Sequence, residues 1–144
     1  MTRINVGILP QELTDSHLNT ELRELPRIFT AVNKRILTHR DFNDIPKSFT
    51  LGTGHVLFFY NKCKYLYDRH SQLRNEYKRR FRKEYQFDDE KTIVPNHLYN
   101  DYIPSKTDRD ILIERISTRI LESNQKPRYC QNEISKKEVV NLLK

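Results

Sequence analysis

The sequence predicts a mainly α-helical protein, a single compact domain with three principal helices and a short C-terminal helix joined by irregular loops. Apolar residues recur every three or four positions in three long stretches, which is the period of an amphipathic helix. The length of 144 residues suits one hydrophobic core. No internal repeat or low-complexity segment interrupts this pattern. We therefore expect one domain over residues 1–144, with residues 135–144 as a possible appended helix.

The first helical stretch begins near Thr14 or Asp15 and contains a proline. Pro26 has no N–H and crowds the carbonyl of Leu22, so we expect a kink that leaves a backbone carbonyl facing a polar group. The apolar positions fall on one face of this helix, which should face the core: Leu18, Leu22, Leu25, Phe29, Val32 and Ile36.

The second stretch should be the longest helix. Its three-four spacing runs through Val56, Phe59, Cys63, Leu66, His70, Leu73, Tyr77 and Phe81. Between the two stretches, residues 38–54 contain Pro46 and the tripeptide Gly52-Thr53-Gly54, which predict a loop or a short extended piece.

The third stretch is expected to be helical from about Asp108 to Ser123, after a mostly irregular segment over residues 84–104. Ile113, Ile116 and Ile120, with Leu112 and Leu121 beside them, define its apolar side, and Arg115 and Arg119 lie one turn apart on its polar side. Ser135 and Glu138 form a capping box that predicts a short terminal helix.

Composition narrows the function classes. The net charge of +7 and the pI near 9.5 predict a positive surface that favours an acidic polymer, with nucleic acid as the leading partner. No run approaches the ~20 apolar residues of a membrane span, and the start of the chain lacks a secretory signal, so we expect no membrane and a cytosolic protein.

Cys63 and Cys130 lack the spacing of a zinc site and are expected to be reduced thiols. The five histidines have no metal-ligand spacing, so we expect no metal.

The N-terminus offers a nucleophile. Thr2 is small enough to permit removal of Met1, which would expose an α-amine whose pKa is about 7.7–8.0 in a model peptide. Such an amine can attack a sugar carbon and hold it as a Schiff base. The polar face of the first helix carries Glu24, flanked by His17, Glu21, Arg23 and Arg27. This face is either simply solvated or brings Glu24 beside the amine of Thr2 as an acid-base group.

The second helix is strongly cationic toward its end. Two interpretations stay open for this charge: ordinary solvation with compensation of the helix dipole, or contact with phosphates. The residues concerned are Lys62, Lys64, Arg69, Arg74, Lys78, Arg79, Arg80, Arg82 and Lys83.

Several blocks in order along the chain resemble one known family. They are Met1-Thr2-Arg3-Ile4-Asn5, Asp15 with His17-Leu18, Arg23-Glu24-Leu25-Pro26-Arg27, Gly52-Thr53-Gly54-His55-Val56 with Phe58-Phe59-Tyr60, and Asp101-Tyr102-Ile103-Pro104. This pattern resembles the phage and viral pyrimidine-dimer DNA glycosylases with associated abasic-site lyase activity, the UV-repair type of endonuclease V.

The resemblance implies a helical protein that binds damaged double-stranded DNA as a monomer and displaces a nucleotide from the stack. It implies that the amine of Thr2 attacks C1′ and forms an imine, and that Glu24 assists β-elimination, without metal or cofactor. It further implies that Arg3, Arg23 and Arg27 hold phosphates and that His17 and Arg115 line the same surface. The location would be the cytoplasm, or the host-cell cytoplasm or nucleoid for a viral protein.

One region departs from the family pattern. The family prototype has a dense tryptophan-tyrosine-lysine cluster after a proline, whereas here Pro127 is followed by Arg128-Tyr129-Cys130-Gln131-Asn132. Tyr129 is the one ring that remains, and we include it and Arg119 among the expected DNA-contacting residues. The alternatives are a related glycosylase for a different damaged or modified base, a non-catalytic basic helical DNA-binding protein, and a small soluble adaptor.

Overall fold

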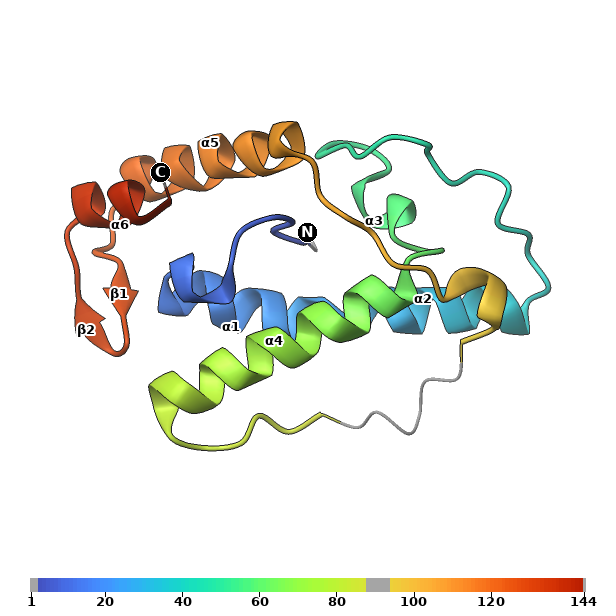
Figure 1. Ribbon diagram of the computed structural model, residues 1–144, viewed down its shortest axis with the longest axis horizontal. Helices are drawn as coiled ribbons and strands as arrows, with labels where there is room; N and C mark the ends of the chain where they lie inside the picture. Colours follow the sequence, from blue (N-terminus) through green and yellow to red (C-terminus); the bar gives the residue numbers. More distant parts are fainter. Residues whose placement is uncertain (1–2, 88–93, 144) are drawn as a thin grey trace. The chain divides into compact units, whose positions relative to one another are not determined.

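The computed structural model describes residues 3–87 and 94–143 (Figure 1). The chain is mainly helical with one small hairpin, which confirms the predicted fold class. In chain order the elements are η1 (Pro10–Glu12), α1 (Asp15–Glu24), α2 (Pro26–Leu37), α3 (His55–Phe58), α4 (Cys63–Phe81), η3 (Asn96–Leu98), α5 (Lys106–Glu122), β1 (Arg128–Tyr129), β2 (Asn132–Glu133) and α6 (Lys136–Leu143).

The chain divides into two compact units that interleave along the sequence. The first comprises the described residues of Met1–Ile4, Glu21–Ser71 and Gln86–Ile103. The second comprises those of Asn5–Thr20, Gln72–Tyr85 and Pro104–Lys144. The prediction of a single domain over residues 1–144 is not tested by this division and stays a prediction.

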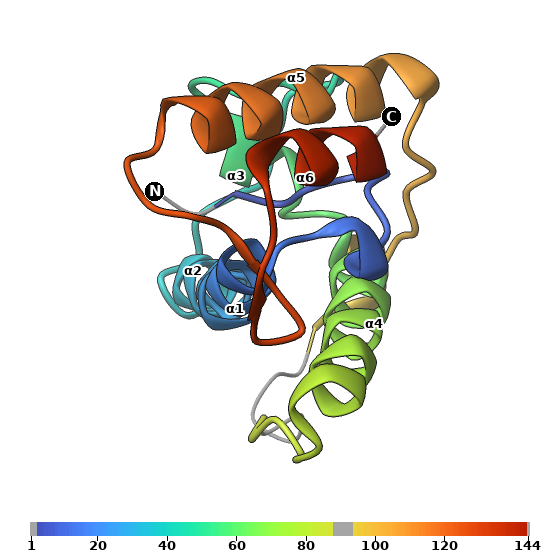
Figure 2. The ribbon, with the colours of Figure 1, turned by 90° about the vertical axis from the view of Figure 1, so that its left-hand side faces the viewer.

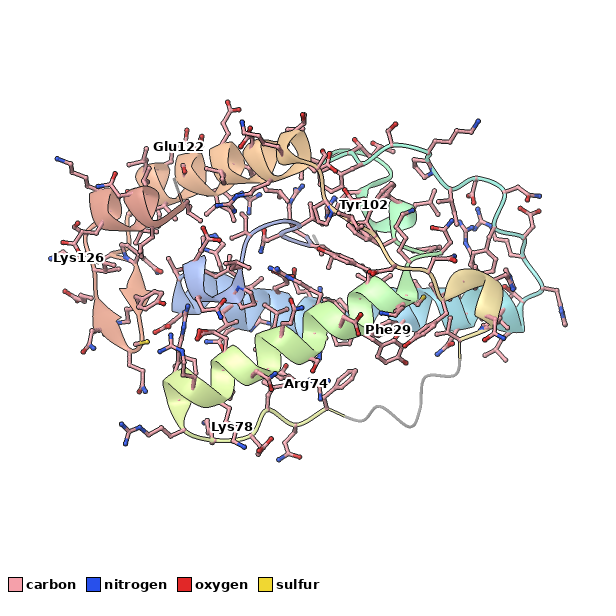
Figure 3. The ribbon with its side chains drawn as sticks, viewed as in Figure 1. Phe29, Arg74, Lys78, Tyr102, Glu122 and Lys126 are labelled. Atoms are coloured by element: carbon pink, nitrogen blue, oxygen red, sulfur yellow. The ribbon has the colours of Figure 1, made fainter. Side chains whose placement is uncertain are left out.

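The first unit has an aromatic core. Phe29 of α2 stacks on Tyr67 of α4 with 4.4 Å between ring centroids (Figure 3). The ring of Phe58 packs edge-on against Phe59 and against Tyr102 at 5.2 Å in each case. Such edge-to-face pairs add to the free energy gained from apolar burial. These contacts join α3 to the segment that precedes α5.

The second unit is built on α5 and α6, which lie side by side (Figures 1 and 2). Arg109 of α5 donates hydrogen bonds to the carbonyl of Gly7 at 2.9 Å, to Glu12 at 2.9 Å and to the carbonyl of Leu143 at 3.3 Å. Gly7 has a φ of +73°, and a Cβ there would lie 2.8 Å from the Cβ of Arg109. Only glycine therefore fits this position without strain.

The predicted break at Pro26 is confirmed. α1 ends at Glu24 and α2 begins at Pro26, where a missing N–H costs nothing because the first helical N–H groups lack partners in any case. Leu18, Leu22, Leu25, Phe29 and Val32 are buried as expected, whereas Ile36 is half-buried.

The second helix differs from the prediction at its start. The pattern from Val56 to Phe81 is divided into α3 and α4, because Asn61 and Lys62 pair with a distant segment instead of continuing a helix. Lys62 forms an isolated β-bridge with Tyr99, and the side-chain amide of Asn100 donates to the carbonyl of Asn61 at 2.8 Å. α4, with 19 residues, is the longest helix in the described part of the chain, as predicted.

The remaining elements follow the sequence closely except for one hairpin. Residues 38–54 form a loop, α5 lies within two residues of its predicted ends, and Ser135 caps α6 by accepting from the N–H of Glu138 at 3.1 Å. Cys63 and Cys130 are free thiols, as expected. The hairpin of β1 and β2 was not predicted, and α5 buries Leu112 while leaving Leu121 exposed.

No helix in residues 3–87 and 94–143 combines the length and the hydropathy that crossing a membrane requires.

Candidate functional site

The residues that follow Thr2 are held by the loop before α3. The guanidinium of Arg3 donates to the carbonyl of Leu51 at 2.8 Å, and the backbone N–H of Ile4 donates to Nε2 of His55 at 3.0 Å. Ile4 is fully buried. Thr2 itself lies outside the described residues, so the predicted proximity of its amine to Glu24 is not tested.

His55 has a defined tautomer. An N–H can only donate, so Nε2 of His55 accepts from Ile4 and the proton of the neutral ring lies on Nδ1. Nδ1 in turn donates to the carbonyl of Thr50 at 2.8 Å. Burial lowers the pKa of His55 from 6.5 to about 4, so the ring is neutral near pH 7.

The break between α1 and α2 frees the carbonyl of Leu22, as the sequence predicted. Pro26 cannot donate to it, and Nε2 of the buried His70 hydrogen-bonds to it at 3.1 Å instead. The N–H of Leu25 still donates to the carbonyl of Glu21 at 2.9 Å, so the chain remains helical up to the break.

Glu24 and Arg27 flank this break. Their side chains lie 3.7 Å apart, and Glu24 is only 14% exposed whereas Arg27 is 59% exposed. Arg23 is exposed one residue before Glu24. A largely shielded carboxylate next to an accessible guanidinium can move a proton while the cation contacts a phosphate.

Two residues expected on polar surfaces are instead buried in the first unit. Glu21 accepts hydrogen bonds from Arg69 at 2.7 and 3.0 Å, and both side chains are almost fully buried. This bidentate pair joins α1 to α4. The interpretation of Glu21 as part of a solvated face, and of Arg69 as a phosphate contact, is therefore wrong.

The cationic end of α4 is likewise largely occupied by ion pairs. Arg80 is buried and donates to Asp15 at 3.0 Å, while Arg79 pairs with Glu76. Lys78 pairs with Glu84 at 2.7 Å on the exposed side (Figure 3). These carboxylates reduce the positive charge that this helix can offer to phosphates.

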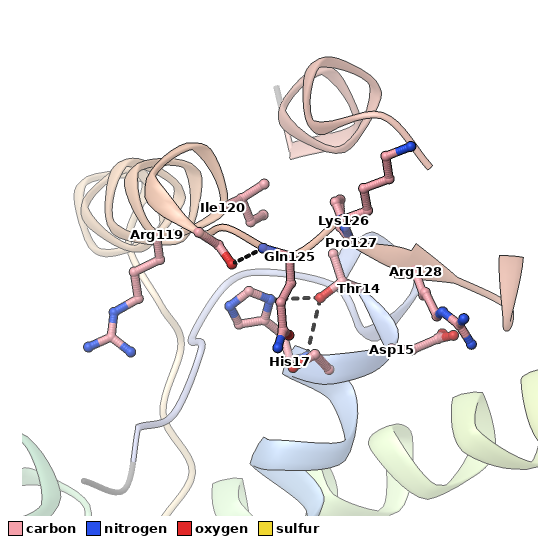
Figure 4. Close-up of a pocket in the computed structure, with 11 residues that line it drawn as sticks. Thr14, Asp15, His17, Arg119, Ile120, Gln125, Lys126, Pro127 and Arg128 are labelled. Atoms are coloured by element: carbon pink, nitrogen blue, oxygen red, sulfur yellow. Dashed lines mark hydrogen bonds between the residues drawn. The ribbon is translucent and has the colours of Figure 1, made fainter. Parts of the chain in front are cut away.

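The second unit contains a polar pocket of about 380 Å³ (Figure 4). His17, at the start of α1, and Arg119, near the end of α5, both line it. Nδ1 of His17 lies 2.7 Å from Oγ1 of Thr14, and that hydroxyl also accepts from the N–H of His17 at 3.2 Å. The other lining residues are Asp15, Ser16, Ile120, Ser123, Gln125, Lys126, Pro127 and Arg128. With Arg119, Lys126 and Arg128 on its wall, the pocket suits an anionic group.

Tyr129 is held within the second unit. Its hydroxyl donates to the carbonyl of Gln11 at 2.6 Å, and the guanidinium of Arg80 lies 4.1 Å from its ring centroid. Arg115 is half-buried on α5. The hairpin tip beside Tyr129 has positive φ at Cys130 and Gln131, whose N–H groups donate to the carboxylate of Asp15 at 2.9 and 2.6 Å.

The expected site residues therefore fall into two described groups. Arg3, Arg23, Glu24 and Arg27 belong to the first unit, and His17, Arg115, Arg119 and Tyr129 belong to the second. Within the groups, the structure brings Glu24 to Arg27 and places His17 and Arg119 on one pocket. Sequence analysis gave His55 and His70 no role in the site, because their hydrogen-bond partners, Ile4 and Leu22, are distant in the sequence. In the described ranges no group of three or more histidine, cysteine, aspartate or glutamate residues is arranged to hold a metal ion.

The comparison with protein families agrees with the resemblance seen in the sequence. A family model described as pyrimidine dimer DNA glycosylase matches residues 1–92. This range includes Thr2, Arg3, His17, Glu24 and His55, whereas the block Asp101-Tyr102-Ile103-Pro104 and α5 lie beyond it. The match covers more than half of the chain, and the chain therefore belongs to the pyrimidine dimer DNA glycosylase family, whose members are DNA repair glycosylases that act on damaged DNA.

Proposed function

We propose that this protein is a DNA glycosylase with abasic-site β-lyase activity on damaged double-stranded DNA, with cyclobutane pyrimidine dimers as the substrate. Family membership supports the glycosylase activity and the choice of lesion. The lyase step is proposed to use the α-amine of Thr2, exposed by removal of Met1, and the carboxylate of Glu24. We propose that the protein acts as a monomer in the cytoplasm without metal or cofactor.

The observation that carries this proposal is the environment of Glu24. Its carboxylate is 14% exposed at a helix break and lies 3.7 Å from an exposed arginine. A carboxylate on a DNA-binding surface repels phosphates, so a protein that only binds DNA gains nothing from it. A group that moves a proton at a sugar carbon explains its presence beside Arg27.

The proposed reaction has two stages, removal of the base and cleavage of the strand. The nitrogen lone pair of the Thr2 amine forms a bond to C1′ of the damaged nucleotide, and the C1′–N bond to the base breaks with its electron pair leaving on the base. The amine gives up one proton, which the base takes, and the C1′–O4′ bond then breaks as the nitrogen lone pair forms a protonated imine, with O4′ taking a proton from solvent. Loss of a proton from C2′, assisted by Glu24, then breaks the C3′–O bond, and the strand on the 3′ side leaves with a 5′ phosphate. Hydrolysis of the imine frees the amine.

DNA binding is proposed to use cations of both units. Arg23 and Arg27 are exposed beside Glu24, and Arg119 is exposed on α5. Arg3, His17, Arg115 and Tyr129 complete the proposed set. Arg3 already donates one hydrogen bond to Leu51, so its role combines fixing the N-terminal segment with contacting a phosphate.

A second candidate substrate follows from Tyr129. Its hydroxyl and one ring face are occupied by Gln11 and Arg80, so the ring is tied to its own protein instead of being offered to a lesion. This observation favours a related glycosylase that acts on a different damaged or modified base.

The test is a panel of duplex oligonucleotides, each with a single cyclobutane dimer, another damaged base, an abasic site or no lesion. Base removal is scored by alkali-induced cleavage, and lyase activity by cleavage without alkali. The proposal expects alkali-independent cleavage of the dimer and abasic duplexes. Cleavage of the abasic duplex and of another lesion, but not of the dimer, would support the second substrate. Binding without any cleavage would overturn the proposed enzyme function.

A further inference from the structure

We infer that His55 is a positioning residue for the N-terminal amine, acting by accepting the backbone N–H of Ile4 and so fixing the segment that carries Thr2. This inference rests on the proposed function, because it concerns the nucleophile of that reaction. The amine of Thr2 is two residues from Ile4, and two extended residues span at most about 7 Å. Fixing Ile4 therefore fixes the part of the chain from which Arg3 and Thr2 extend.

The geometry around His55 leaves the ring a single orientation. The ring lies between Phe49 and Phe59, with centroid separations of 5.5 and 5.4 Å and edge-to-face packing. Nδ1 is fixed by its hydrogen bond to the carbonyl of Thr50 at 2.8 Å. With both the ring plane and Nδ1 fixed, Nε2 points at the N–H of Ile4.

An imidazole suits this position because it accepts a hydrogen bond while uncharged. The charged groups that act on the ring are Arg3, which disfavours its protonation, and Glu21, which favours it. The Glu21 carboxylate is already paired with Arg69. A protonated His55 would have two donors and no acceptor, and it would release the N–H of Ile4.

Two substitutions distinguish the hydrogen bond at Nδ1 of His55 from the hydrogen bond at Nε2. His55→Asn retains a donor near the Nδ1 position for Thr50 but is too short to reach Ile4. His55→Gln places its amide oxygen near the Nε2 position and can accept from Ile4. If His55 acts only by filling the core, both variants should behave alike, because neither restores the aromatic ring.

The first experiment measures three quantities in the wild type and both variants. They are the single-turnover rate of cyanoborohydride trapping on a duplex with one abasic site at saturating protein, the Kd for that duplex, and the exchange rate of the Ile4 amide by NMR. We expect His55→Asn to trap at least tenfold more slowly, with Kd within twofold and Ile4 exchange at least tenfold faster. His55→Gln should recover most of both losses.

The outcomes separate this inference from the proposed function. A wild type that forms no trapped adduct overturns the proposed imine chemistry, and the inference with it. A wild type that traps, together with His55→Asn that traps at the same rate, overturns the positioning role alone. Recovery of Ile4 protection in His55→Gln without recovery of trapping would also contradict it.

A second measurement covers the case in which His55→Asn does not fold. The trapping rate of the wild type is divided by that of His55→Gln from pH 7 to pH 4. Every other group that changes with pH is common to both proteins and cancels in this ratio, so that only the His55 ring remains. We expect the ratio to fall about twofold by pH 4, where about half of the His55 rings carry a second proton, and a ratio that stays flat overturns the inference.

Discussion

Nε2 of His70 lies 3.1 Å from the carbonyl oxygen of Leu22, in the place where a helix without Pro26 would supply a backbone N–H. A carbonyl only accepts, so Nε2 carries the proton and donates. The side chain is fully buried on α4. This hydrogen bond stabilises the break between α1 and α2. Glu24 and Arg27 lie on either side of that break.

His70→Phe should destabilise the protein and misplace Glu24. The variant keeps a ring but leaves the buried carbonyl of Leu22 without its donor, which costs about 1–3 kcal/mol. Urea unfolding measures this loss. His70→Gln, whose amide can reach the same carbonyl, is the matched control and should recover at least half of it. Equal stability of His70→Phe and the wild type would contradict a structural role for this hydrogen bond.

Glu24→Gln should suppress strand cleavage at an abasic site by at least tenfold, because the amide cannot accept the C2′ proton. DNA affinity should stay equal or increase, since a negative charge near phosphates is removed. Single-turnover cleavage and Kd are measured on the same duplex. Glu138→Gln, an exposed carboxylate on α6, is the control and should leave both quantities unchanged. Full cleavage by Glu24→Gln would exclude this carboxylate from the mechanism.

Arg27→Ala should weaken binding to damaged and intact duplexes alike. Loss of one phosphate contact lowers the slope of log Kd against log salt by about one unit. The side chain is 59% exposed, so its removal should change the stability of the fold little. Lys137→Ala removes one exposed charge on α6 and serves as the control. An unchanged slope for Arg27→Ala would show that Arg27 contacts no phosphate.

Stability should fall in mild acid because of His55. Its pKa is about 4 in the folded protein and 6.5 as its ordinary value, so below pH 6.5 the unfolded chain binds a proton that the folded chain does not. The neutral His55 ring therefore contributes about 3 kcal/mol to the free energy of unfolding. This contribution is complete above pH 6.5 and is lost as the pH falls to about 4. Urea unfolding at pH 7, 5.5 and 4.5 should show a steeper loss for the wild type than for His55→Gln. Parallel losses would contradict the depressed pKa.

Local patterns were sufficient to predict most of the fold. The three-four spacing located α1, α2, α4 and α5, and Pro26 predicted both the break and the free carbonyl of Leu22. These features depend on residues within a few positions of one another. The identity of the donor, His70, depends on a contact 48 residues away and could not be read from spacing.

Long-range contacts also explain the errors. Lys62 pairs with Tyr99 instead of continuing a helix, and the hairpin tip at Cys130 and Gln131 keeps positive φ because Asp15 accepts its N–H groups. The candidate site shows the same difference between local patterns and long-range contacts. The block Arg23 to Arg27 indicated Glu24 and its neighbouring cations, whereas the anchor of Ile4 on His55 appears only in three dimensions.

Borohydride trapping followed by peptide mapping tests the central claim most directly. The protein is incubated with a duplex that contains one abasic site, reduced, digested, and analysed by mass spectrometry. The account predicts a sugar adduct on the α-amine of Thr2 in protein that lacks Met1. The account also predicts that this adduct is absent from Thr2→Arg, in which the bulky second residue prevents removal of Met1. An adduct on a lysine side chain, or none while the strand is still cleaved, would contradict the account.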